Sequence, residues 1–526
     1  MKRTHWLALA GFASLVLFLR LPTFHRSVLD WDESTFLLIA RGLLRGQNPY
    51  DVSWEHGPHG ISVLFAIGQM LFGQSVVAIR LLTWLAVTLE CFLLYRLGDL
   101  LGRTGSGAGV IAGLLYAVLS LTNQGLPAHR ELFWAPLATL ALILLLTAGP
   151  AAALPSRRAN VLWLLAGLLL GFGLQLKYLY IFDVAAIVII GLLTLASGWS
   201  AGLGKLITRT WLLALLLIAG GLAAWLIEAS YLFRTRDVAE YIFGHFTASA
   251  AYSSSGALSL DALKIRLVLQ ITTSPLLWLS LALTPIYLLV VKPVDRRERR
   301  HMAYMALWFG LALLDTIFTK RLWEHYFLVL LPPLCLLTAL LVTGLLRPDA
   351  GMDRRRRVLA LILLLGAPLV PVALPAAAAS AGLVYRHYVR GLPMPPDAPA
   401  EVAAYLREHV PASEPIYIAD YEPIVYFLAD RKAPTRYAFP PRLIDQQFAK
   451  VDRIDPLAEL AAIMTRQPSY LVRVAPPSPD MTNPAFAAAL DRYVQERYIL
   501  EKAIPALDTF TEQPISVQIY RLKDGS

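Results

Sequence analysis

The sequence predicts a polytopic α-helical membrane protein with a C-terminal soluble α/β domain. Of its 526 residues, 57% are hydrophobic and only 16% are charged, a composition outside the range of soluble globular domains. The apolar residues gather in long runs separated by short basic stretches, whereas the composition from about residue 381 onward is that of a soluble domain. We therefore expect two domains, residues 1–380 and 381–526.

The apolar runs predict about eleven membrane-spanning helices, since a span needs about 20 mostly apolar residues. The segment 59–73 is apolar but short, and we expect it to form an interfacial or re-entrant helix. Residues 32–46 place apolar side chains at helical spacing, which predicts an amphipathic helix along the membrane surface. The predicted spans lie near 5–22, 76–98, 107–122, 131–149, 159–176, 178–197, 208–231, 268–291, 302–318, 325–346 and 358–378.

The net charge of +10 comes from basic residues in short runs between apolar segments. Such runs are typical of the cytoplasmic loops of membrane proteins, so they indicate orientation in a bilayer and not nucleic acid as a partner. If the N-terminus is cytoplasmic, the loop 23–75 and the C-terminal domain face outward. Every strong basic cluster then falls on the cytoplasmic side, namely Lys2 and Arg3, Arg103, Arg157 and Arg158, Lys205 and Arg209, 296–300, Arg347 and 354–357.

The C-terminal domain opens with a proline-rich linker, GLPMPPDAPA. Helical patterns at 398–409, 455–466 and 484–496 alternate with the strand-like runs PIYIAD, YLVRV and SVQIYRL. This alternation predicts a small α/β fold. The domain contains no nucleotide-binding glycine pattern.

Charged side chains are concentrated in the loop that follows the first span, between residues 30 and 60. A solvated connection would explain the charges alone. The tryptophans, prolines and glycines beside them instead indicate a site with rigid turns, so this loop is the candidate active site. Its acidic residues and histidines are Asp30, Asp32, Glu33, Asp51, Glu55, His56 and His59.

Acids at one membrane face suit a transfer from a lipid-linked substrate to an external acceptor. A sugar on a polyprenyl phosphate carries its own leaving group, because the phosphate departs as an anion, so the protein must chiefly activate the acceptor hydroxyl. One carboxylate acting as general base contributes roughly 10²–10⁴-fold. In an inverting displacement, this base lies on the face of the sugar opposite the leaving group. Asp32 or Glu33 fits that role.

The donor phosphate requires cations at the same membrane face. Lys177 ends an apolar helix, and because a charge at mid-bilayer costs roughly 2.5–3.5 kcal/mol or more we place it at the outer boundary. The alternative is that Lys177 binds no phosphate and is an ordinary lysine at a helix end, whose side chain extends to the membrane surface. Lys320 and Arg321 precede the tenth apolar segment on the same face. Basic residues on the outer face run against the positive-inside rule, so a bound anion is a reasonable explanation for their presence there.

The same stretches resemble a known family. Asp32-Glu33 with STFLLIARGLLRGQNPY, and then WEHGPHGISVLFAIGQMLFG, is similar to the first external loop of the GT-C glycosyltransferases. The resemblance is to the group of protein O-mannosyltransferases and bacterial lipid A aminoarabinose transferases. The helix ending in Lys177 and the pattern His325-Tyr326 before a proline pair also match, and the similarity covers about residues 5–345.

The resemblance implies roles for individual residues. Asp32 matches the family's proposed catalytic base, and Glu33 matches its companion. Glu55 matches the acid of a Glu-Lys-Pro-Pro pattern, and Tyr326 a tyrosine near the lipid phosphate.

The chain departs from the family where the phosphate is expected. His56 stands in place of a phosphate-binding lysine. Histidine is largely neutral at pH 7 unless an anion raises its pKa, so we expect the phosphate to depend more on Lys177, Arg321 or an arginine in 232–266.

The stretch His129-Arg130-Glu131 occupies the place of the family's second acidic motif. Arg130 and Glu131, together with His59, are therefore assigned to the acceptor or to a secondary role. The alternative for Glu131 is an ordinary helix start, where an acid is favoured by the helix dipole.

These features predict an integral membrane glycosyltransferase that transfers a sugar from a polyprenyl-phosphate donor to lipid A, a cell-surface glycan or a protein. We expect it in a bacterial inner membrane, with the site and the C-terminal domain on the periplasmic side. A transporter or flippase of lipid-linked saccharides is the alternative, although the charges gather at one face and the chain shows no internal repeat. A scaffold that binds the cell envelope through the tail is a third. The sequence does not decide whether a divalent metal ion binds near the acids. Cys91 and Cys335 lie in apolar stretches, so they predict neither a disulfide framework nor a metal site.

Overall fold

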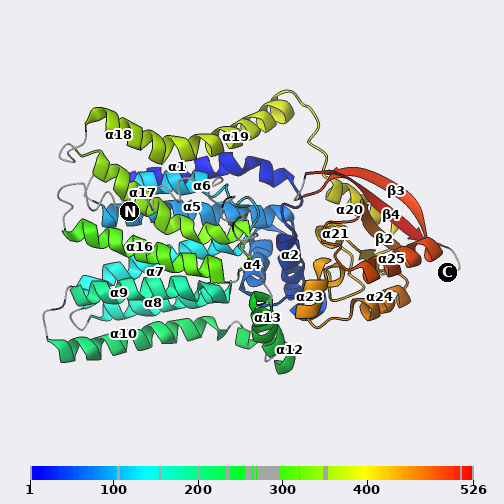
Figure 1. The fold of residues 1–526 in the computed structure, drawn as a ribbon, viewed down its shortest axis with the longest axis horizontal. Coiled ribbons are helices and arrows are strands. Elements are labelled where there is room, and N and C mark those ends of the chain that lie inside the picture. The colour runs from blue at the N-terminus through cyan, green and yellow to red at the C-terminus, as the bar shows by residue number, and fades with distance from the viewer. Residues whose placement is uncertain are drawn as a thin grey trace.

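Helices that run side by side form the larger part of the molecule, and the C-terminal domain lies beyond one end of this bundle (Figure 1). The computed structural model describes residues 3–102, 107–152, 156–197, 199, 202–226, 228–230, 237–254, 264, 268, 296–318, 320–347, 353–509 and 512–523. In this part of the chain nine helices are long and apolar enough to cross a membrane. They contain α1 (Arg3–Arg20), α5 (Val76–Leu101), α7 (Arg130–Ala152), α8 (Arg157–Leu174), α9 (Ile181–Ser197), α10 (Leu203–Ala224), α16 (Arg296–Phe318), α17 (Leu331–Leu345), and α18 and α19 (Arg354–Leu361 and Ala367–Leu383).

These nine helices coincide with nine of the predicted spans. The stretch predicted at 107–122 forms α6 (Ala108–Leu119), which has 12 residues, fewer than a span needs, and packs against α5 and α17. The span predicted at 268–291 lies outside the described residues.

The outer helices of the bundle expose apolar side chains. On α10, Trp211, Leu215 and Leu222 are 60–67% exposed. Water would disfavour such a surface, whereas the hydrocarbon of a bilayer matches it. Every residue of α17 is buried, so this helix lies at the centre. The chain is a multi-pass membrane protein.

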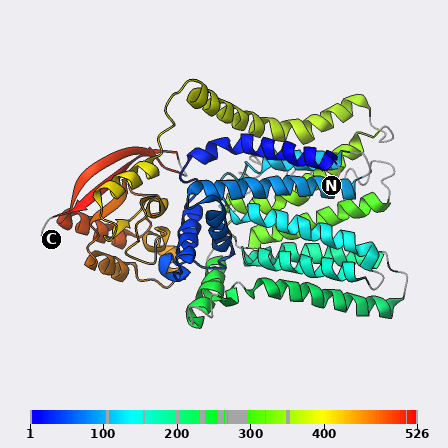
Figure 2. The same cartoon turned by 180° about the vertical axis from the view of Figure 1, so that it is seen from behind.

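Two shorter helices lie across the end of the bundle that faces the C-terminal domain, α2 (Trp31–Leu44) and α4 (Gly60–Phe72), as Figures 1 and 2 show. Asp30 caps α2, its side chain accepting a hydrogen bond from the Asp32 backbone N–H at 2.8 Å. This cap fixes where the helix begins and therefore places Asp32 in its first turn. The layer continues with α3 (Pro49–Val52), α12 (Val238–Ile242), a π-helix (Phe243–Ala248) and α13 (Ser249–Ser254).

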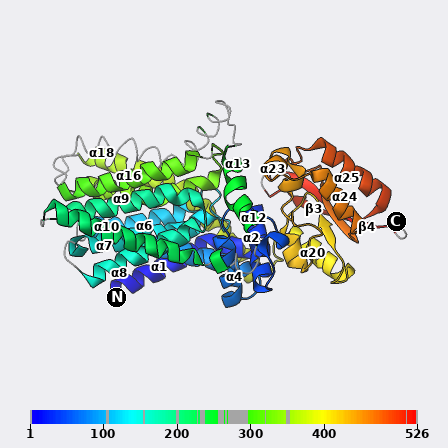
Figure 3. The same cartoon turned by 90° about the horizontal axis from the view of Figure 1, so that it is seen from below.

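The C-terminal domain has a four-stranded sheet of order β1-β2-β4-β3, covered by helices (Figure 3). Strand β1 pairs with β2 in parallel, and the other two pairs are antiparallel. The predicted helices and strands all occur there. The elements are α20 (Ala398–His409), β1 (Ile416–Ile418), α21 (Ile424–Ala429), α22 (Pro441–Ile444), α23 (Gln446–Val451), α24 (Pro456–Thr465), β2 (Tyr470–Ala475), α25 (Pro484–Arg497), β3 (Tyr498–Leu507) and β4 (Pro514–Leu522).

Strand β3 is the strand of this domain that the sequence did not predict, and the short helices α21, α22 and α23 were not predicted either. Strand β3 is an edge strand with mostly exposed side chains and contains Pro505, so it lacks both the apolar alternation and the composition that indicate a strand.

Candidate active site

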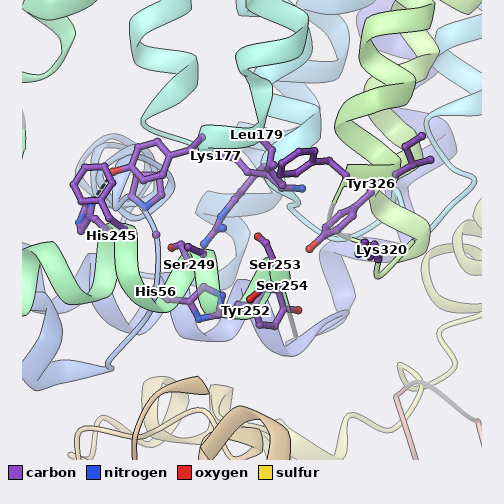
Figure 4. A pocket seen from close by; sticks show the side chains of 18 residues that line it. His56, Lys177, Leu179, His245, Ser249, Tyr252, Ser253, Ser254, Lys320 and Tyr326 are labelled. Atoms are coloured by element: carbon purple, nitrogen blue, oxygen red, sulfur yellow. Dashed lines mark hydrogen bonds between the residues drawn. The ribbon is translucent and has the colours of Figure 1, made fainter. Parts of the chain in front are cut away.

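A small cavity of about 80 Å³ lies at the N-terminal end of α2, between the bundle and the C-terminal domain. A larger cavity of about 820 Å³ adjoins it, and Figure 4 shows the side chains that line this larger cavity. Residues common to both are His56, Arg130, Lys177, Tyr252 and Tyr326. The small cavity is completed by Asp32, Phe36, Glu55, His129, Glu131, His325, Phe439, Arg442 and Phe448.

Asp32 lines the small cavity together with Glu55. Burial, reinforced by the charge of Glu55, raises the pKa of Asp32 to about 6, although nearby arginines oppose the rise. A carboxyl group with such a pKa is mostly ionised at pH 7 and is a stronger base than an ordinary aspartate. Its position and pKa both suit a general base.

Glu33, which the sequence predicted to assist catalysis, is not among the residues that line the small cavity. Arg80 binds both of its carboxylate oxygens at 2.6 Å, and the backbone N–H groups of Leu29 and Ala128 donate to them at 2.7 and 3.0 Å. Burial opposes ionisation of Glu33, but Arg80 and these donors hold its pKa below the usual value. The carboxylate fastens the start of α2 to α5, so its role is structural.

Replacing Glu33 with Gln should therefore lower stability more than it alters the chemistry. The Arg80 guanidinium would be left buried without its counter-ion, and breaking a buried pair in this way costs about 3–5 kcal/mol. Thermal unfolding of the purified protein in detergent measures the effect. Asp51→Asn, at an exposed position of the same loop, is the control and should unfold like the wild type. An unchanged melting temperature for Glu33→Gln would contradict the structural role.

Glu55 meets the C-terminal domain inside the cavity. Its Oε1 lies 3.0 Å from Nη2 of Arg442, which comes from α22, and Arg442 also pairs with Asp452 of the same domain. Burial opposes ionisation of Glu55, but Arg442 outweighs it and keeps the pKa of Glu55 below its usual value. The Arg442 side chain is fully buried, so this cross-domain pair closes the cavity on one side.

His56 is neutral in this setting. Burial lowers its pKa to about 3, with Arg442 adding to the effect and Glu55 opposing it. Its ring stacks on Tyr252 with centroids 4.6 Å apart. A neutral imidazole offers a phosphate one hydrogen-bond donor but no charge.

The cationic side of the site is built on Lys177. Its Nζ lies 2.9 Å from Oε1 of Glu131 and 3.4 Å from the centre of the Tyr326 ring. Arg130 stacks on Phe36 at 4.4 Å. The structure thus brings Lys177, Arg130, Glu131 and Tyr326 together with Asp32 around the small cavity.

Two predicted residues lie outside both cavity linings. Arg321 stacks on the Tyr252 ring at 3.7 Å and donates to the Tyr252 carbonyl at 3.2 Å, so Tyr252 separates it from the space. His59 packs edge-on against Tyr50, with ring centroids 4.9 Å apart. The neighbouring Lys320 does line the larger cavity.

Several lining residues were not predicted. Arg442, Phe439 and Phe448 belong to the C-terminal domain, and no local pattern could indicate that they approach Asp32. His129 and His325 stack with ring centroids 4.2 Å apart. With Asp32 they form one of two groups, among the described residues, whose ligand atoms lie close enough to hold a metal ion. The other is His59, Glu228 and His245.

Part of the sequence and the overall fold resemble known proteins. Residues 56–227 match the family described as dolichyl-phosphate-mannose-protein mannosyltransferase. Among solved structures, ArnT from Cupriavidus metallidurans bound to undecaprenyl phosphate is 16% identical over 98% of both chains, with a TM-score of 0.58. The same protein in the apo state is 14% identical over 98% of both chains, with a TM-score of 0.53. No curated protein matches the sequence.

The solved structures show that the chain has the fold of the GT-C glycosyltransferases, which confirms the predicted fold class, and residues 56–227 resemble the mannosyltransferase family.

Proposed function

We propose that this enzyme transfers a sugar from a polyprenyl-phosphate donor to a hydroxyl group of an extracytoplasmic acceptor, with inversion. The observation that carries the proposal is the pair of adjoining cavities, which places the Asp32 carboxylate next to a hollow that is partly apolar and partly cationic. The ArnT structure that this fold resembles was solved with undecaprenyl phosphate, which supports a donor of this class.

The larger cavity suits the donor. Leu179, Phe246 and Phe318 give it an apolar wall for a prenyl chain, while Lys177 and Lys320 offer cations for the phosphate. Lys177 Nζ lies 2.9 Å from Oε1 of Glu131. A phosphate bound in the larger cavity would therefore compete with Glu131 for Lys177. Tyr326 lines both cavities, where its hydroxyl group can donate to a phosphate oxygen.

In the proposed step, the acceptor hydroxyl attacks the anomeric carbon and gives its proton to Asp32. The new C–O bond forms as the bond from that carbon to the phosphate oxygen breaks, and the phosphate leaves with the electron pair. Lys177 and Arg130 stabilise the departing anion. Glu55, held ionised by Arg442, accepts a hydrogen bond from the acceptor.

The positive-inside pattern supports an outward-facing site. The basic clusters at Lys205 and 354–357 belong to the ends of the spans away from the C-terminal domain (Figure 1). We therefore place the cavities and residues 381–526 at the periplasmic face of a bacterial inner membrane, with lipid A, a surface glycan or a protein as acceptor.

The test uses purified protein, a synthetic short-chain polyprenyl-phosphate sugar and fractions of envelope glycolipid, glycan and protein as acceptors. We expect release of polyprenyl phosphate and a labelled acceptor in one fraction. Lys177→Met removes a charge-assisted contact worth about 1.5–3 kcal/mol, so the donor KM should rise about 10- to 100-fold. Lys205→Met, far from the cavities, should leave it unchanged. If intact donor moves across the membrane of proteoliposomes and no sugar is transferred, the proposed enzyme function is rejected and the transporter function is favoured.

A further inference from the structure

Three potential metal ligands from separate segments meet at the edge of the larger cavity. They are His59 before α4, Glu228 after α10 and His245 in the π-helix Phe243–Ala248. All three are buried, with exposed fractions of 5, 3 and 0%. One ligand atom from each lies within 4.8 Å of the others.

From this geometry we propose that His59, Glu228 and His245 bind a divalent transition metal, with Zn²⁺ as the ion that the donor set fits best. Two imidazoles and one carboxylate, with a fourth position for water, are a ligand set that proteins use for zinc. His245 also lines the larger cavity, so the proposed metal site adjoins the proposed donor site. The role of the metal site would be to join three segments that otherwise meet only through side-chain packing and a few hydrogen bonds.

The carboxylate provides the first argument. A buried acid is expected to be paired or to coordinate a metal, yet among the described residues no lysine or arginine pairs with Glu228. Its Oε1 accepts a hydrogen bond from the His59 backbone N–H at 3.2 Å. Its Oε2 points toward Nε2 of His245 at 3.8 Å. That distance is too long for a hydrogen bond. It is slightly wider than the roughly 3.4 Å that separates two ligands of a tetrahedral zinc ion.

The orientation of the His245 ring also favours metal binding. Nδ1 of His245 lies 2.5 Å from the Tyr178 hydroxyl oxygen, and Tyr241 stacks on the ring with centroids 4.0 Å apart. Tyr178 also hydrogen-bonds Tyr241, so its oxygen can accept from Nδ1–H of His245. In that tautomer, Nε2 keeps its lone pair and faces Glu228. Metal-binding histidines are commonly held in this way through the other ring nitrogen.

The backbone holds the ligand-bearing segments in place. The Gly57 N–H donates to the Gly244 carbonyl at 3.0 Å, which ties the loop before His59 to the π-helix that carries His245. The Gly60 N–H donates to the Gln175 carbonyl at 2.9 Å, and a Cβ at Gly60 would approach that oxygen to 2.4 Å. Only glycine permits this contact. A π-helix within a helical segment is frequently found at functional sites.

Metal content of the full-length protein tests the proposal. The protein is purified in detergent, loaded with Zn²⁺, freed of loose metal by a weak chelator and measured by elemental analysis. We expect about one zinc ion per chain for the wild type, and none for His245→Ala or Glu228→Gln. His129→Ala, in the other group of potential ligands, is the matched control and should keep the ion. If His129→Ala alone loses its zinc, the metal binds to Asp32, His129 and His325 and the proposed assignment is wrong.

Two further measurements do not depend on the folding of ligand variants. Tyr178→Phe leaves all three ligands in place and removes the support of His245, so zinc affinity should fall about 10- to 100-fold. Co²⁺ added to the metal-free wild type should give the visible absorption of a tetrahedral site and raise the melting temperature. A wild type that takes up neither Zn²⁺ nor Co²⁺ would refute the proposal, whatever the variants show.

Discussion

Asp32→Asn should lower kcat for sugar transfer roughly 10²–10⁴-fold, the usual contribution of a general base. An amide cannot take the proton of the acceptor hydroxyl. Its size matches the carboxyl group, and the Asp30 cap that fixes α2 is unaffected because it uses only the Asp32 backbone N–H. Single-turnover transfer from the synthetic donor measures the loss, and donor binding should persist. Asp51→Asn, in the same loop but exposed, is the matched control, and equal activity of Asp32→Asn and Asp51→Asn would exclude Asp32 as the base.

The pH profile gives an independent measure of the same role. Because the base must be ionised, kcat/KM of the wild type should fall as pH drops through about 6, the value to which burial and Glu55 raise the pKa of Asp32. Glu55→Gln removes one of the charges that raise it, so the acid limb should move to lower pH. A limb that stays in place, or moves up, would show that another group controls the rate.

Arg442→Gln should destabilise the protein strongly. It leaves the carboxylates of Glu55 and Asp452 buried without their common counter-ion. Breaking a buried pair costs about 3–5 kcal/mol. Thermal unfolding should show the loss, and the C-terminal domain should become more susceptible to proteolysis near the linker before Ala398 because a contact with the bundle is lost.

Two variants make this prediction specific. Arg436→Gln, also in the C-terminal domain, breaks a partly exposed pair with Glu240, so it should cost less than about 1 kcal/mol. Adding Glu55→Gln to Arg442→Gln removes one of the stranded charges and should restore part of the stability, which a double-mutant cycle detects as coupling. Additive losses would mean that the two residues do not act as a pair.

The bundle and the position of the site could be predicted because both leave local signals. Long apolar runs identified nine spans, and the acids of the first loop identified the segment that contains Asp32 and Glu55. The helical spacing over 32–46 likewise predicted α2. These inferences need only the periodicity of neighbouring residues.

Which of these residues face the cavity and which pair elsewhere could not be predicted, because this depends on contacts between residues that are distant in the sequence. Asp32 and Glu33 are adjacent, yet Glu33 faces Arg80 on α5, whereas Asp32 faces the cavity. Arg442 reaches Glu55 from a domain that begins hundreds of residues later, and nothing near either residue indicates the pairing. The position of Arg321 next to the membrane predicted a phosphate contact, but Arg321 lines neither cavity and stacks on the Tyr252 ring.

The complete burial of α17 has a consequence for how substitutions there behave. By hydropathy alone, this helix looks like a lipid-facing span, but its side chains fill space between other helices. Shortening Leu337, which is fully buried, leaves a void and costs about 2–5 kcal/mol. The same truncation at Leu215, which is 60% exposed on α10, lets acyl chains move into the vacated volume. In this protein, apolar character therefore does not reveal which span is sensitive to side-chain volume.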